Sequence, residues 1–279
     1  MKQLYFLSGI PRSGSTVLAN ILNQHPDIYV SPTSGLLDLI FFSEQNLQKL
    51  EKAYVIDPIQ KKNIIQSTID SYYAHRNETI ILDKHRGWPR NLPAIARYVP
   101  NLKIVINYRP IAEAVTSMIK LMKKNEKKYK KRANPVDDFL RSKNLEINTQ
   151  NRAHAIFHQL WKEPYENMLF GMNYEKKHLQ SGKEKIFHYV NYDDLINDPG
   201  KVLSGIVMFL SADGQFTFNF NKIANNLKEN DSTYWNMPGL HDVRSSLTKQ
   251  SWDPDKVLGP ELTKHFSQYD FNLETSPPD

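Results

Sequence analysis

The chain has 279 residues, a length that favours one large α/β domain, here residues 1–279, over two small ones. It contains no cysteine, which excludes disulfides, zinc–thiolate sites, Fe–S clusters and a cysteine nucleophile. Its 36 Lys and Arg residues against 30 Asp and Glu residues give a formal net charge of +6, which favours anionic partners without naming one.

Apolar runs of strand length alternate with helical patterns along the whole chain, and no repeat or low-complexity linker interrupts them. Strands are expected at residues 4–7, 28–30, 79–82, 103–108 and 186–190. Helices are expected at residues 17–22, 58–73, 111–122, 151–177 (with a kink or break at Pro164) and 201–209. Apolar strands separated by helices predict an α/β fold with a central parallel sheet flanked by helices on both faces. Ligands of such sheets bind at the carboxyl ends of the strands, so the residues that follow each strand matter most.

The residues that follow the first strand, Gly9–Thr16, have the spacing of a phosphate-binding loop, G-x-x-x-x-G-K-[ST], with one change. Ser15 stands in the lysine position, and the nearest cation is Arg12. Glycines let the backbone surround an anion, the N–H groups of residues 12–16 can point at it, and the helix that begins near Ser15 adds its positive end. The pattern predicts a P-loop-like anion site, and the alternative is a Gly/Ser turn with a polar helix cap.

The absent lysine argues against a nucleoside triphosphatase. Phosphoryl transfer from ATP relies on that lysine and on Mg²⁺ held by the loop hydroxyl and an acidic residue after another strand. Asp83, after the third strand, could serve as that acidic residue, but residues 84–86 follow it at once with Lys-His-Arg, which is typical of an anion site. A group with less charge than a γ-phosphate, transferred without a metal, suits arginine and lysine alone. A sulfuryl group is of this kind.

Pro11–Thr16 resembles the 5′-phosphosulfate loop of sulfotransferases that use 3′-phosphoadenosine 5′-phosphosulfate (PAPS). Residues 103–118 resemble a second segment of this family, in which a strand ends in an arginine and a serine follows eight residues later. The resemblance implies that Arg109 and Ser117 bind the 3′-phosphate of the donor. An arginine fork at a strand end and a hydroxyl two turns into the next helix also make a good phosphate clamp on chemical grounds. The alternative for Arg109 alone is a surface ion pair.

Two later segments extend the resemblance. Residues 190–195 are similar to the Y-E-D-L segment that follows the last core strand of many sulfotransferases, which implies that Tyr192 contacts the donor nucleotide. The alternative is a tyrosine and two aspartates that cap the next helix. Sulfotransferases usually close the donor site with a late basic loop, and residues 239–249 offer Arg244 and Lys249 for it. Ordinary loop charge explains these two cations equally well.

Lys84 and His85 follow the third strand, where the family commonly places a lysine that reaches the transferred group. Its cytosolic members place a catalytic histidine two residues beyond that lysine, but Arg86 takes this position here. Members that act on tyrosine in secreted proteins instead use a glutamate after the helix of the loop, and residues 31–34 contain no acid. The general base is therefore open, with His85 the first candidate and Asp38 the second.

Residues 120–132 form a basic run, in which eight of thirteen side chains are Lys or Arg. The run is either a solvated helix end or a landing surface for an acidic acceptor, such as a polyanionic glycan or an acid-flanked peptide. A nucleic-acid partner is disfavoured, because no nucleic-acid-binding module accompanies the run. Three tryptophans could line a pocket or belong to the core and stay unassigned: Trp161, Trp235 and Trp252.

Neither a membrane helix nor a signal peptide is expected. The longest apolar stretch near the start, residues 35–42, contains Asp38 and is far shorter than the ~18 residues that a membrane helix needs. The first nine residues lack the long apolar region and the cleavage site of a signal peptide. We therefore expect a cytoplasmic protein without a membrane partner.

The residues and the resemblance together predict a sulfotransferase with a P-loop NTPase-like fold. It would use PAPS as the donor, release 3′-phosphoadenosine 5′-phosphate (PAP) and need no metal. The predicted donor-binding residues are Arg12, Ser13, Gly14, Ser15, Thr16, Arg109, Ser117, Tyr192, Arg244 and Lys249. The predicted catalytic residues are Arg12, Lys84 and His85. The acceptor is expected to be a small molecule, an acidic glycan or a peptide, and the oligomeric state is open. A Mg²⁺-dependent kinase or nucleotidase and a non-catalytic binder of acidic polymers remain as alternatives.

Overall fold

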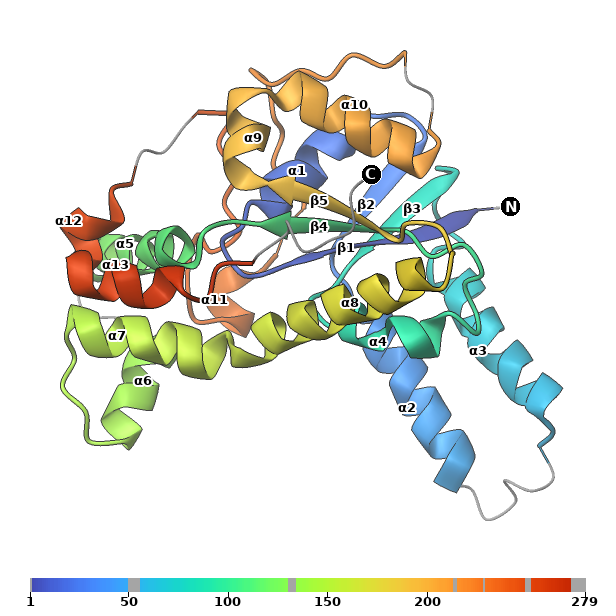
Figure 1. The fold of residues 1–279 in the computed structure, drawn as a ribbon, viewed down its shortest axis with the longest axis horizontal. Coiled ribbons are helices and arrows are strands. Elements are labelled where there is room, and N and C mark those ends of the chain that lie inside the picture. The colour runs from blue at the N-terminus through green and yellow to red at the C-terminus, as the bar shows by residue number, and fades with distance from the viewer. Residues whose placement is uncertain are drawn as a thin grey trace.

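Five parallel strands form one sheet at the centre of the protein (Figure 1). The structure is a computed structural model and describes residues 2–49, 56–129, 134–212, 215–227, 229–248 and 252–271. The strands are β1 (Gln3–Gly9), β2 (Ile28–Thr33), β3 (Ile80–Lys84), β4 (Ile104–Tyr108) and β5 (Phe187–Asn191), in the spatial order β2-β3-β1-β4-β5. The five expected strands are confirmed, with ends that differ by up to three residues.

Helices cover both faces of the sheet and confirm the α/β architecture (Figure 1). One face carries α1 (Ser15–Leu22), α9 (Tyr192–Asn197) and α10 (Pro199–Leu210). The other face and the helical region beside it contain α2 (Leu36–Lys49), α3 (Pro58–Tyr72), α4 (Trp88–Ile95), α5 (Ile111–Tyr129), α6 (Pro135–Ser142), α7 (Thr149–Ala155), the π-helix η1 (Ile156–Leu160), α8 (Lys162–Gln180), α12 (Pro254–Leu258) and α13 (Pro260–Ser267). A single helical turn, α11 (Asp231–Tyr234), lies in the segment between α10 and α12, which is called the late segment below.

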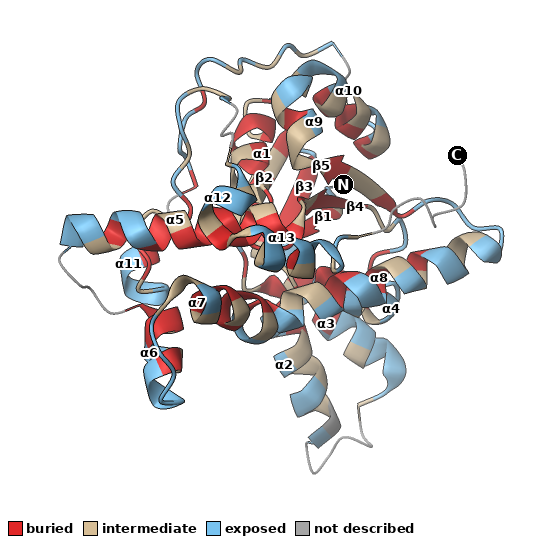
Figure 2. Ribbon diagram, turned by 60° about the vertical axis from the view of Figure 1, so that its left-hand side comes forward, coloured by how far each residue is buried: buried red, intermediate tan, exposed pale blue. Residues whose placement is uncertain are grey.

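Alternate residues of each strand pack into two separate hydrophobic cores, one on each face of the sheet. In β1, Tyr5 and Leu7 belong to the core under α1 and α10. Phe6, between them, faces the other way and packs on Trp88 of α4, with ring centroids 4.2 Å apart. Figure 2 shows the strands and the inner sides of the helices as the buried part of the molecule.

The same alternation governs β3 and decides which of its last side chains reaches the loop after β1. Leu82 packs into the core under α1, and Ile81 packs into the opposite core. Asp83 and Lys84 continue this alternation, so they point to opposite faces of the sheet. Lys84 points to the α1 side and Asp83 points to the α4 side.

Two of the expected helices differ clearly in extent from the sequence-based prediction. The helix expected over residues 151–177 is divided, because α7 runs into η1 and α8 begins only after Trp161. Pro164 lies in the first turn of α8, where its missing N–H costs no intrahelical bond, so the break precedes the proline. Helix α5 continues past Met122 to Tyr129, since the lysines and glutamate there are good helix formers.

Helix α2 was not among the helices expected from the sequence. In the structure Asp38 is exposed in the first turn of α2, where a carboxylate interacts favourably with the positive end of the helix. Leu36, Leu37 and Ile40 of the same helix are buried. No helix within the described ranges has both the length and the apolarity required to cross a bilayer.

Strand β1 lies between β3 and β4, so the loop that follows it has the ends of both strands as neighbours. Parallel sheets bind ligands at such points, where consecutive connections leave the central strand in opposite directions. The fold therefore brings the residues after β1, β3, β4 and β5 to one edge of the sheet.

Candidate active site

The loop between β1 and α1 has a backbone shape that requires glycine at both ends. Gly9 has φ +152°, and a Cβ there would lie 2.3 Å from the backbone oxygen of Asn107 in β4. Gly14 has φ +93°, and a Cβ there would lie 2.7 Å from Cδ2 of Tyr192. Gly14 precedes α1 without a capping side chain, so the first N–H groups of the helix have no side-chain acceptor. The loop thus presents backbone donors at the positive end of a helix, which is an arrangement that binds phosphate-like anions.

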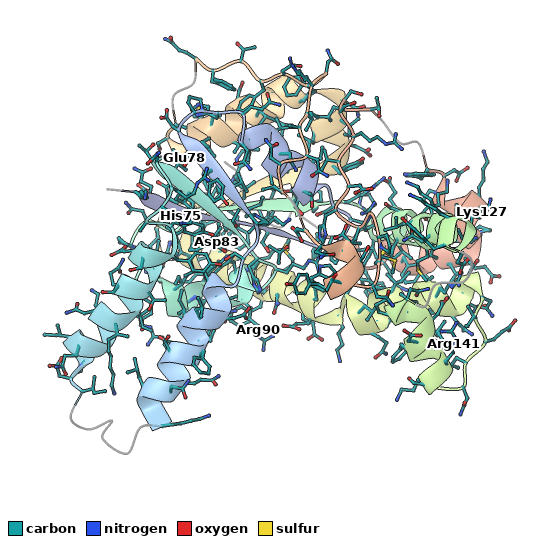
Figure 3. The ribbon with its side chains drawn as sticks, turned by 180° about the vertical axis from the view of Figure 1, so that it is seen from behind. His75, Glu78, Asp83, Arg90, Lys127 and Arg141 are labelled. Atoms are coloured by element: carbon teal, nitrogen blue, oxygen red, sulfur yellow. The ribbon has the colours of Figure 1, made fainter. Side chains whose placement is uncertain are left out.

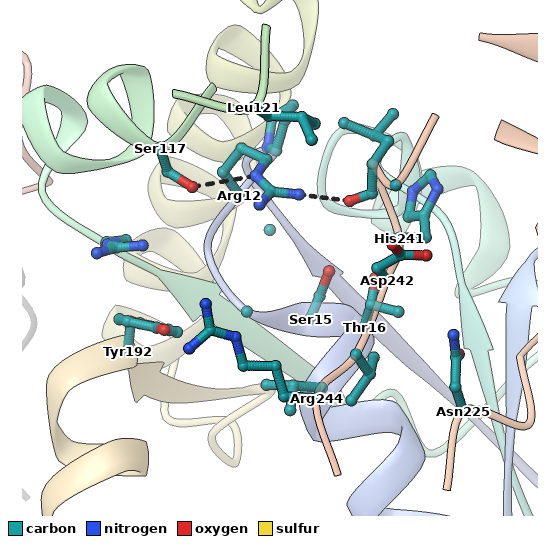
Figure 4. Close-up of a pocket in the computed structure, with 18 of the residues that line it drawn as sticks. Arg12, Ser15, Thr16, Ser117, Leu121, Tyr192, Asn225, His241, Asp242 and Arg244 are labelled. Carbon is teal, nitrogen blue, oxygen red and sulfur yellow. Dashed lines mark hydrogen bonds between the residues drawn. The ribbon is translucent and has the colours of Figure 1, made fainter. Parts of the chain in front are cut away.

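Two side chains of this loop are held by the protein itself. The hydroxyl and the N–H of Ser13 both donate to the carbonyl oxygen of Ile10, at 2.7 and 3.3 Å. Ser13 is fully buried and its hydroxyl supports the loop from inside, so any contribution of this predicted donor-binding residue is indirect. Arg12 donates from Nε to Oγ of Ser117 at 3.2 Å, and its Nη1 donates to the carbonyl oxygen of Leu240 (Figure 4). Arg12 therefore joins the loop to α5 and to the late segment.

A cavity of about 540 Å³ opens at this edge of the sheet, a volume usual for small-molecule sites. The loop, the ends of β3 and β4, one side of α5 and the segment 239–248 line it. Its lining among the described residues has one carboxylate, Asp242, and seven Lys or Arg side chains. These cations are Arg12, Lys84, Arg86, Arg109, Lys120, Lys124 and Arg244. Such an excess of positive charge favours a ligand with several negative charges.

Arg109 and Ser117 line the same cavity as the loop, so the structure brings together the residues predicted for the two ends of the donor. Arg109 is buried, and its Nε donates to Oε2 of Glu113 at 3.0 Å. Its guanidinium carbon lies 4.1 Å from the centre of the Tyr192 ring. Tyr192 also lies against Gly14, so one line of contacts runs from the loop to the end of β4.

Lys84 lies between the loop and the late segment. Its Nζ is 2.9 Å from Oε1 of Glu229 and 3.5 Å from Oγ1 of Thr16. Burial lowers the pKa of Lys84, and Glu229 offsets part of that shift. Burial acts against the charge on Glu229, but Lys84 and His241 outweigh it and hold the pKa of Glu229 below its usual value. The two groups therefore form a buried ion pair beside the loop.

Asp83 does not face the cavity. Its Oδ2 accepts from the hydroxyls of Ser34 and Tyr73, both at 2.5 Å, and its Oδ1 accepts from Nε1 of Trp88 at 2.7 Å. Asp83 is fully buried, and burial raises its pKa above the usual value. Figure 3 shows Asp83 inside the molecule. The possibility that Asp83 holds a metal beside the loop is therefore wrong for this structure, since three donors on the opposite side of β3 already bind its oxygens.

His85, the first candidate for the general base, lines the cavity. Its hydrogen bonds favour the wrong tautomer for a base. Its Nδ1 accepts from the backbone N–H of Gly87 at 3.0 Å. In the neutral ring the proton is then on Nε2, which is a donor and not a proton acceptor. Burial lowers the pKa of His85, which favours the neutral ring. Asp38, the second candidate, is exposed and does not line the cavity.

His241, which the sequence analysis did not single out, has the opposite pattern. Its Nδ1 lies 2.5 Å from Oδ1 of Asp231, and its backbone N–H donates to Oδ2 of the same carboxylate at 2.8 Å. A carboxylate only accepts, so the proton of the neutral ring is on Nδ1 and Nε2 carries the lone pair. Burial lowers the pKa of His241, against the opposing effects of Asp231 and Glu229. A neutral imidazole oriented by a carboxylate is a suitable general base near neutral pH.

Only a weak sequence signal points to Glu229, Asp231 and His241. His241 lies within residues 239–249, the candidate for the late basic loop. Glu229 and Asp231 precede that stretch. The described residues of this part of the chain form no strand, so the rule that places residues at strand ends gives no position for them.

Of the two cations expected from the late segment, Arg244 lines the cavity. It is exposed, with Nη1 3.5 Å from Oγ1 of Thr248. Lys249 lies outside the described residues. Trp252 does line the cavity, and Nζ of Lys120 lies 3.5 Å from the centre of its ring. Trp161 belongs to the core.

The basic run divides into two parts. Lys120 and Lys124 line the cavity, on the side of α5 that faces it. Lys123, Lys127 and Lys128 are exposed on the same helix. The last part of the run, residues 130–132, lies outside the described residues. The beginning of the run is thus part of the cavity mouth.

Residues 5–215 match the model of the sulfotransferase family. A putative protein-tyrosine sulfotransferase of Caenorhabditis briggsae is 27% identical over 128 residues, which are 42% of this chain and 43% of that relative. The matched part is therefore less than half of the length of this relative.

Two solved structures are similar at low sequence identity. Mouse sulfotransferase SULT7A1, complexed with PAP, is 16% identical with a TM-score of 0.48, over 96% of this chain and 83% of that one. The sulfotransferase domain from the Synechococcus PCC 7002 olefin synthase is 18% identical with a TM-score of 0.47, over 98% of this chain and 96% of that one.

Proposed function

Because the chain belongs to the sulfotransferase family, we propose that it transfers a sulfuryl group from PAPS to an acceptor hydroxyl. The observation that carries this proposal is the position of Lys84, whose ammonium lies 3.5 Å from the loop hydroxyl of Thr16. Among the described residues, the cavity beside it is lined by seven Lys or Arg side chains and one carboxylate. This excess of positive charge suits a donor with charged groups at both ends.

The donor would span the cavity from the loop to β4. The backbone N–H groups at the start of α1, together with Lys84, would hold the 5′-phosphosulfate. Arg109 and Ser117 would hold the 3′-phosphate, with the guanidinium as a fork and the hydroxyl as a further donor. Arg12 already donates to Ser117, so it lies between these two groups and can interact with either phosphate.

Lys84 and Asp83 together favour sulfuryl transfer over the Mg²⁺-dependent alternative. In P-loop nucleoside triphosphatases the loop hydroxyl and an acidic residue after a neighbouring strand hold Mg²⁺. Here the ammonium of Lys84 is beside that hydroxyl, and the carboxylate of Asp83 is bound on the other face of the sheet. A fixed cation would therefore take the place of a metal beside the loop hydroxyl, which suits the smaller charge of a transferred sulfuryl group.

His241 and Lys84 would carry the two sides of the reaction. His241 Nε2 would accept the proton of the acceptor hydroxyl as its oxygen bonds to sulfur, and Asp231 would stabilise the resulting imidazolium. The bond between sulfur and the bridging oxygen breaks, and its electron pair stays on the 5′-phosphate of PAP. Lys84 and Arg12 would stabilise this developing charge. We thus assign the base to His241 instead of His85, on the hydrogen-bonding patterns of the two rings.

The cationic mouth of the cavity supports an acidic acceptor. Lys120, Lys124 and Arg244 line the cavity, and Lys123 and Lys127 continue the positive charge outward on α5. The name of the Caenorhabditis briggsae relative specifies protein tyrosine. We therefore propose a hydroxyl within an acid-flanked peptide as the first acceptor to test, with small phenols and alcohols as the comparison.

The test is transfer of labelled sulfate from PAPS to three acceptors: a tyrosine peptide flanked by acidic residues, the same peptide flanked by neutral residues, and a simple phenol. We expect transfer that persists in EDTA, is fastest with the acidic peptide, and is about 10²–10³ slower in Lys84→Met. Arg90→Gln, which removes an exposed cation of α4 (Figure 3), is the matched control and is expected to retain activity. Hydrolysis of ATP that stops in EDTA, without any use of PAPS, would establish the kinase or nucleotidase alternative.

A further inference from the structure

Three histidines form a cluster outside the cavity described above. His154 lies in α7, His158 in the π-helix η1, and His265 in the last turn of α13, so the cluster joins two parts of the chain 107 residues apart. One ring nitrogen from each histidine can be chosen so that all three lie within 4.8 Å of one another. All three side chains are half-buried. Figure 1 shows α13 beside α7 at the end of the molecule.

The spacing of these nitrogens suits a tetrahedral metal ion. Nε2 of His158 lies 3.3 Å from Nε2 of His265. Two imidazole ligands at the usual Zn–N distance of about 2.0–2.1 Å have their nitrogens about 3.3–3.4 Å apart in a tetrahedral site. The rings of His154 and His158 are stacked, with centroids 5.6 Å apart and planes inclined by 18°. One ring nitrogen of His154 lies within 4.8 Å of a ring nitrogen of each of the other two histidines, so a side-chain rotation that shortens these distances would complete the set.

Two further features support a ligand at this place. His154 and His158 would share a helix face in any α-helix, but here the wider π-helix begins between them, and π-helical turns frequently occur at functional sites. The side-chain amide of Gln268 lies 3.1 Å from Nδ1 of His265. Its oxygen and nitrogen are interchangeable by rotation, so Gln268 can accept the Nδ1–H of a ring that binds a metal through Nε2. Metal-binding histidines generally have such a partner on the other ring nitrogen.

We propose that His154, His158 and His265 form a Zn²⁺ site with a fourth position for water. Three imidazoles select a borderline-soft divalent ion over Mg²⁺ or Ca²⁺, which prefer oxygen ligands. The site is separate from sulfuryl transfer and does not rest on the proposed function. Its ion would fasten α13 to α7 and η1. Asp270, just after α13, accepts from the backbone N–H of Ile111 at 2.6 Å, so a fastened α13 would also hold the start of α5.

Isothermal titration of the EDTA-treated, full-length protein with ZnCl₂ tests this site. We expect one ion per chain and an affinity that falls at least about tenfold in His158→Ala, since even partners behind the ligands contribute 10–100-fold. His75→Ala, which removes an exposed histidine remote from the cluster (Figure 3), is expected to bind like the wild type. Less than one ion per chain, or equal affinity in His158→Ala, would overturn the proposal.

Titration with Co²⁺ separates loss of the site from loss of the fold. Co²⁺ bound by three imidazoles and water gives the strong visible absorption of tetrahedral coordination, which surface binding does not give. We expect this spectrum in the wild type and in His75→Ala, and its loss in His265→Gln when circular dichroism shows a folded protein. A weak, octahedral spectrum in the wild type would contradict the site, whatever the stability of the variants.

Discussion

Nζ of Lys84 lies 2.9 Å from Oε1 of Glu229, although 145 positions separate the two residues in the chain. Lys84 ends β3, and Glu229 lies just before α11, where the described residues form no strand. The pair is buried and also touches Thr16 and His241. It therefore joins the loop between β1 and α1 to the side of the cavity where the proposed reaction would deprotonate an acceptor.

Replacing Lys84 by Met should reduce turnover more than it reduces donor binding. The methionine keeps the apolar stem but removes the ammonium, so the charge that develops on the leaving phosphate loses one stabilising group. We expect a loss of about 10²–10³ in kcat. PAP affinity, measured by calorimetry, should fall less, because the loop amides and Arg109 remain. A variant with kcat near the wild type would remove Lys84 from the transfer step.

His241 should set the acidic limb of the pH–rate profile. Burial lowers the pKa of His241, so we expect activity to persist below the ordinary histidine pKa of about 6.5 and to fall only as the ring becomes protonated. His241→Gln should lower kcat/KM by about 10²–10⁴ and abolish this limb. Asp231→Asn should keep the ring but lower kcat, because the imidazolium loses its partner.

The matched comparison for this prediction is His85→Gln, in the other histidine of the cavity. It should keep the acidic limb, since Nδ1 of His85 accepts from Gly87 and the ring offers no proton acceptor to the cavity. Loss of the limb in His85→Gln, with the limb intact in His241→Gln, would return the base to His85.

Asp83 should make the protein less stable as pH rises. Burial raises the pKa of Asp83 in the folded state above its value of 3.8 in the unfolded chain. The folded state thus binds this proton more tightly, and the bound proton stabilises the fold. This stabilisation is complete below pH 3.8 and is lost as the pH rises through the pKa of Asp83 in the folded state. The contribution of Asp83 to the free energy of urea unfolding should therefore fall with pH, with a slope of at most ~1.4 kcal/mol per pH unit.

Asp83→Asn removes this proton equilibrium, so its difference in stability from the wild type should shrink as pH rises. Asp70→Asn, at an exposed aspartate of α3, is the control for the same change of side chain at the surface. A constant difference for Asp83→Asn across the pH range would mean that Asp83 titrates normally in the folded protein.

Gly9→Ala tests the close approach of the loop to β4. A Cβ there meets the backbone oxygen of Asn107 at 2.3 Å, and this atom cannot move without distorting the sheet. We expect a loss of about 2–5 kcal/mol from strain and overpacking combined. Gly182→Ala is the control, since its φ of +75° is also positive but nothing lies within 4 Å of the added atom. It should lose only about 1–2 kcal/mol. Equal losses in urea unfolding would contradict the close approach.

The sheet and half of the site could be predicted because their signals are local. Each strand is a short apolar run, and a parallel sheet brings the residues after such runs to one edge. This rule was enough to group Gly9–Thr16, Lys84, Arg109 and Tyr192. It does not distinguish neighbouring residues unless the strand end is correct. The third strand was expected to stop at Leu82, so Asp83 was placed in a loop instead of on the buried face of β3.

The other half of the site depends on contacts that no local pattern encodes. Glu229, Asp231 and His241 lie in a segment whose only regular element is α11, within the described residues between α10 and α12. Their position depends on side-chain contacts with Lys84 and Thr33, which are far away in sequence. The tautomers of His85 and His241 likewise depend on Gly87 and Asp231, and composition or spacing cannot reveal them.

The most direct measurement is calorimetric titration with PAP, with adenosine 5′-phosphate, which lacks the 3′-phosphate, and with ATP–Mg²⁺. If Arg109 and Ser117 hold the 3′-phosphate, PAP should bind at least about tenfold more tightly than adenosine 5′-phosphate, the worth of one charged hydrogen bond. This difference should shrink in Arg109→Gln and in the milder Ser117→Ala. Equal binding of the two nucleotides, or tight binding of ATP–Mg²⁺ alone, would contradict the account.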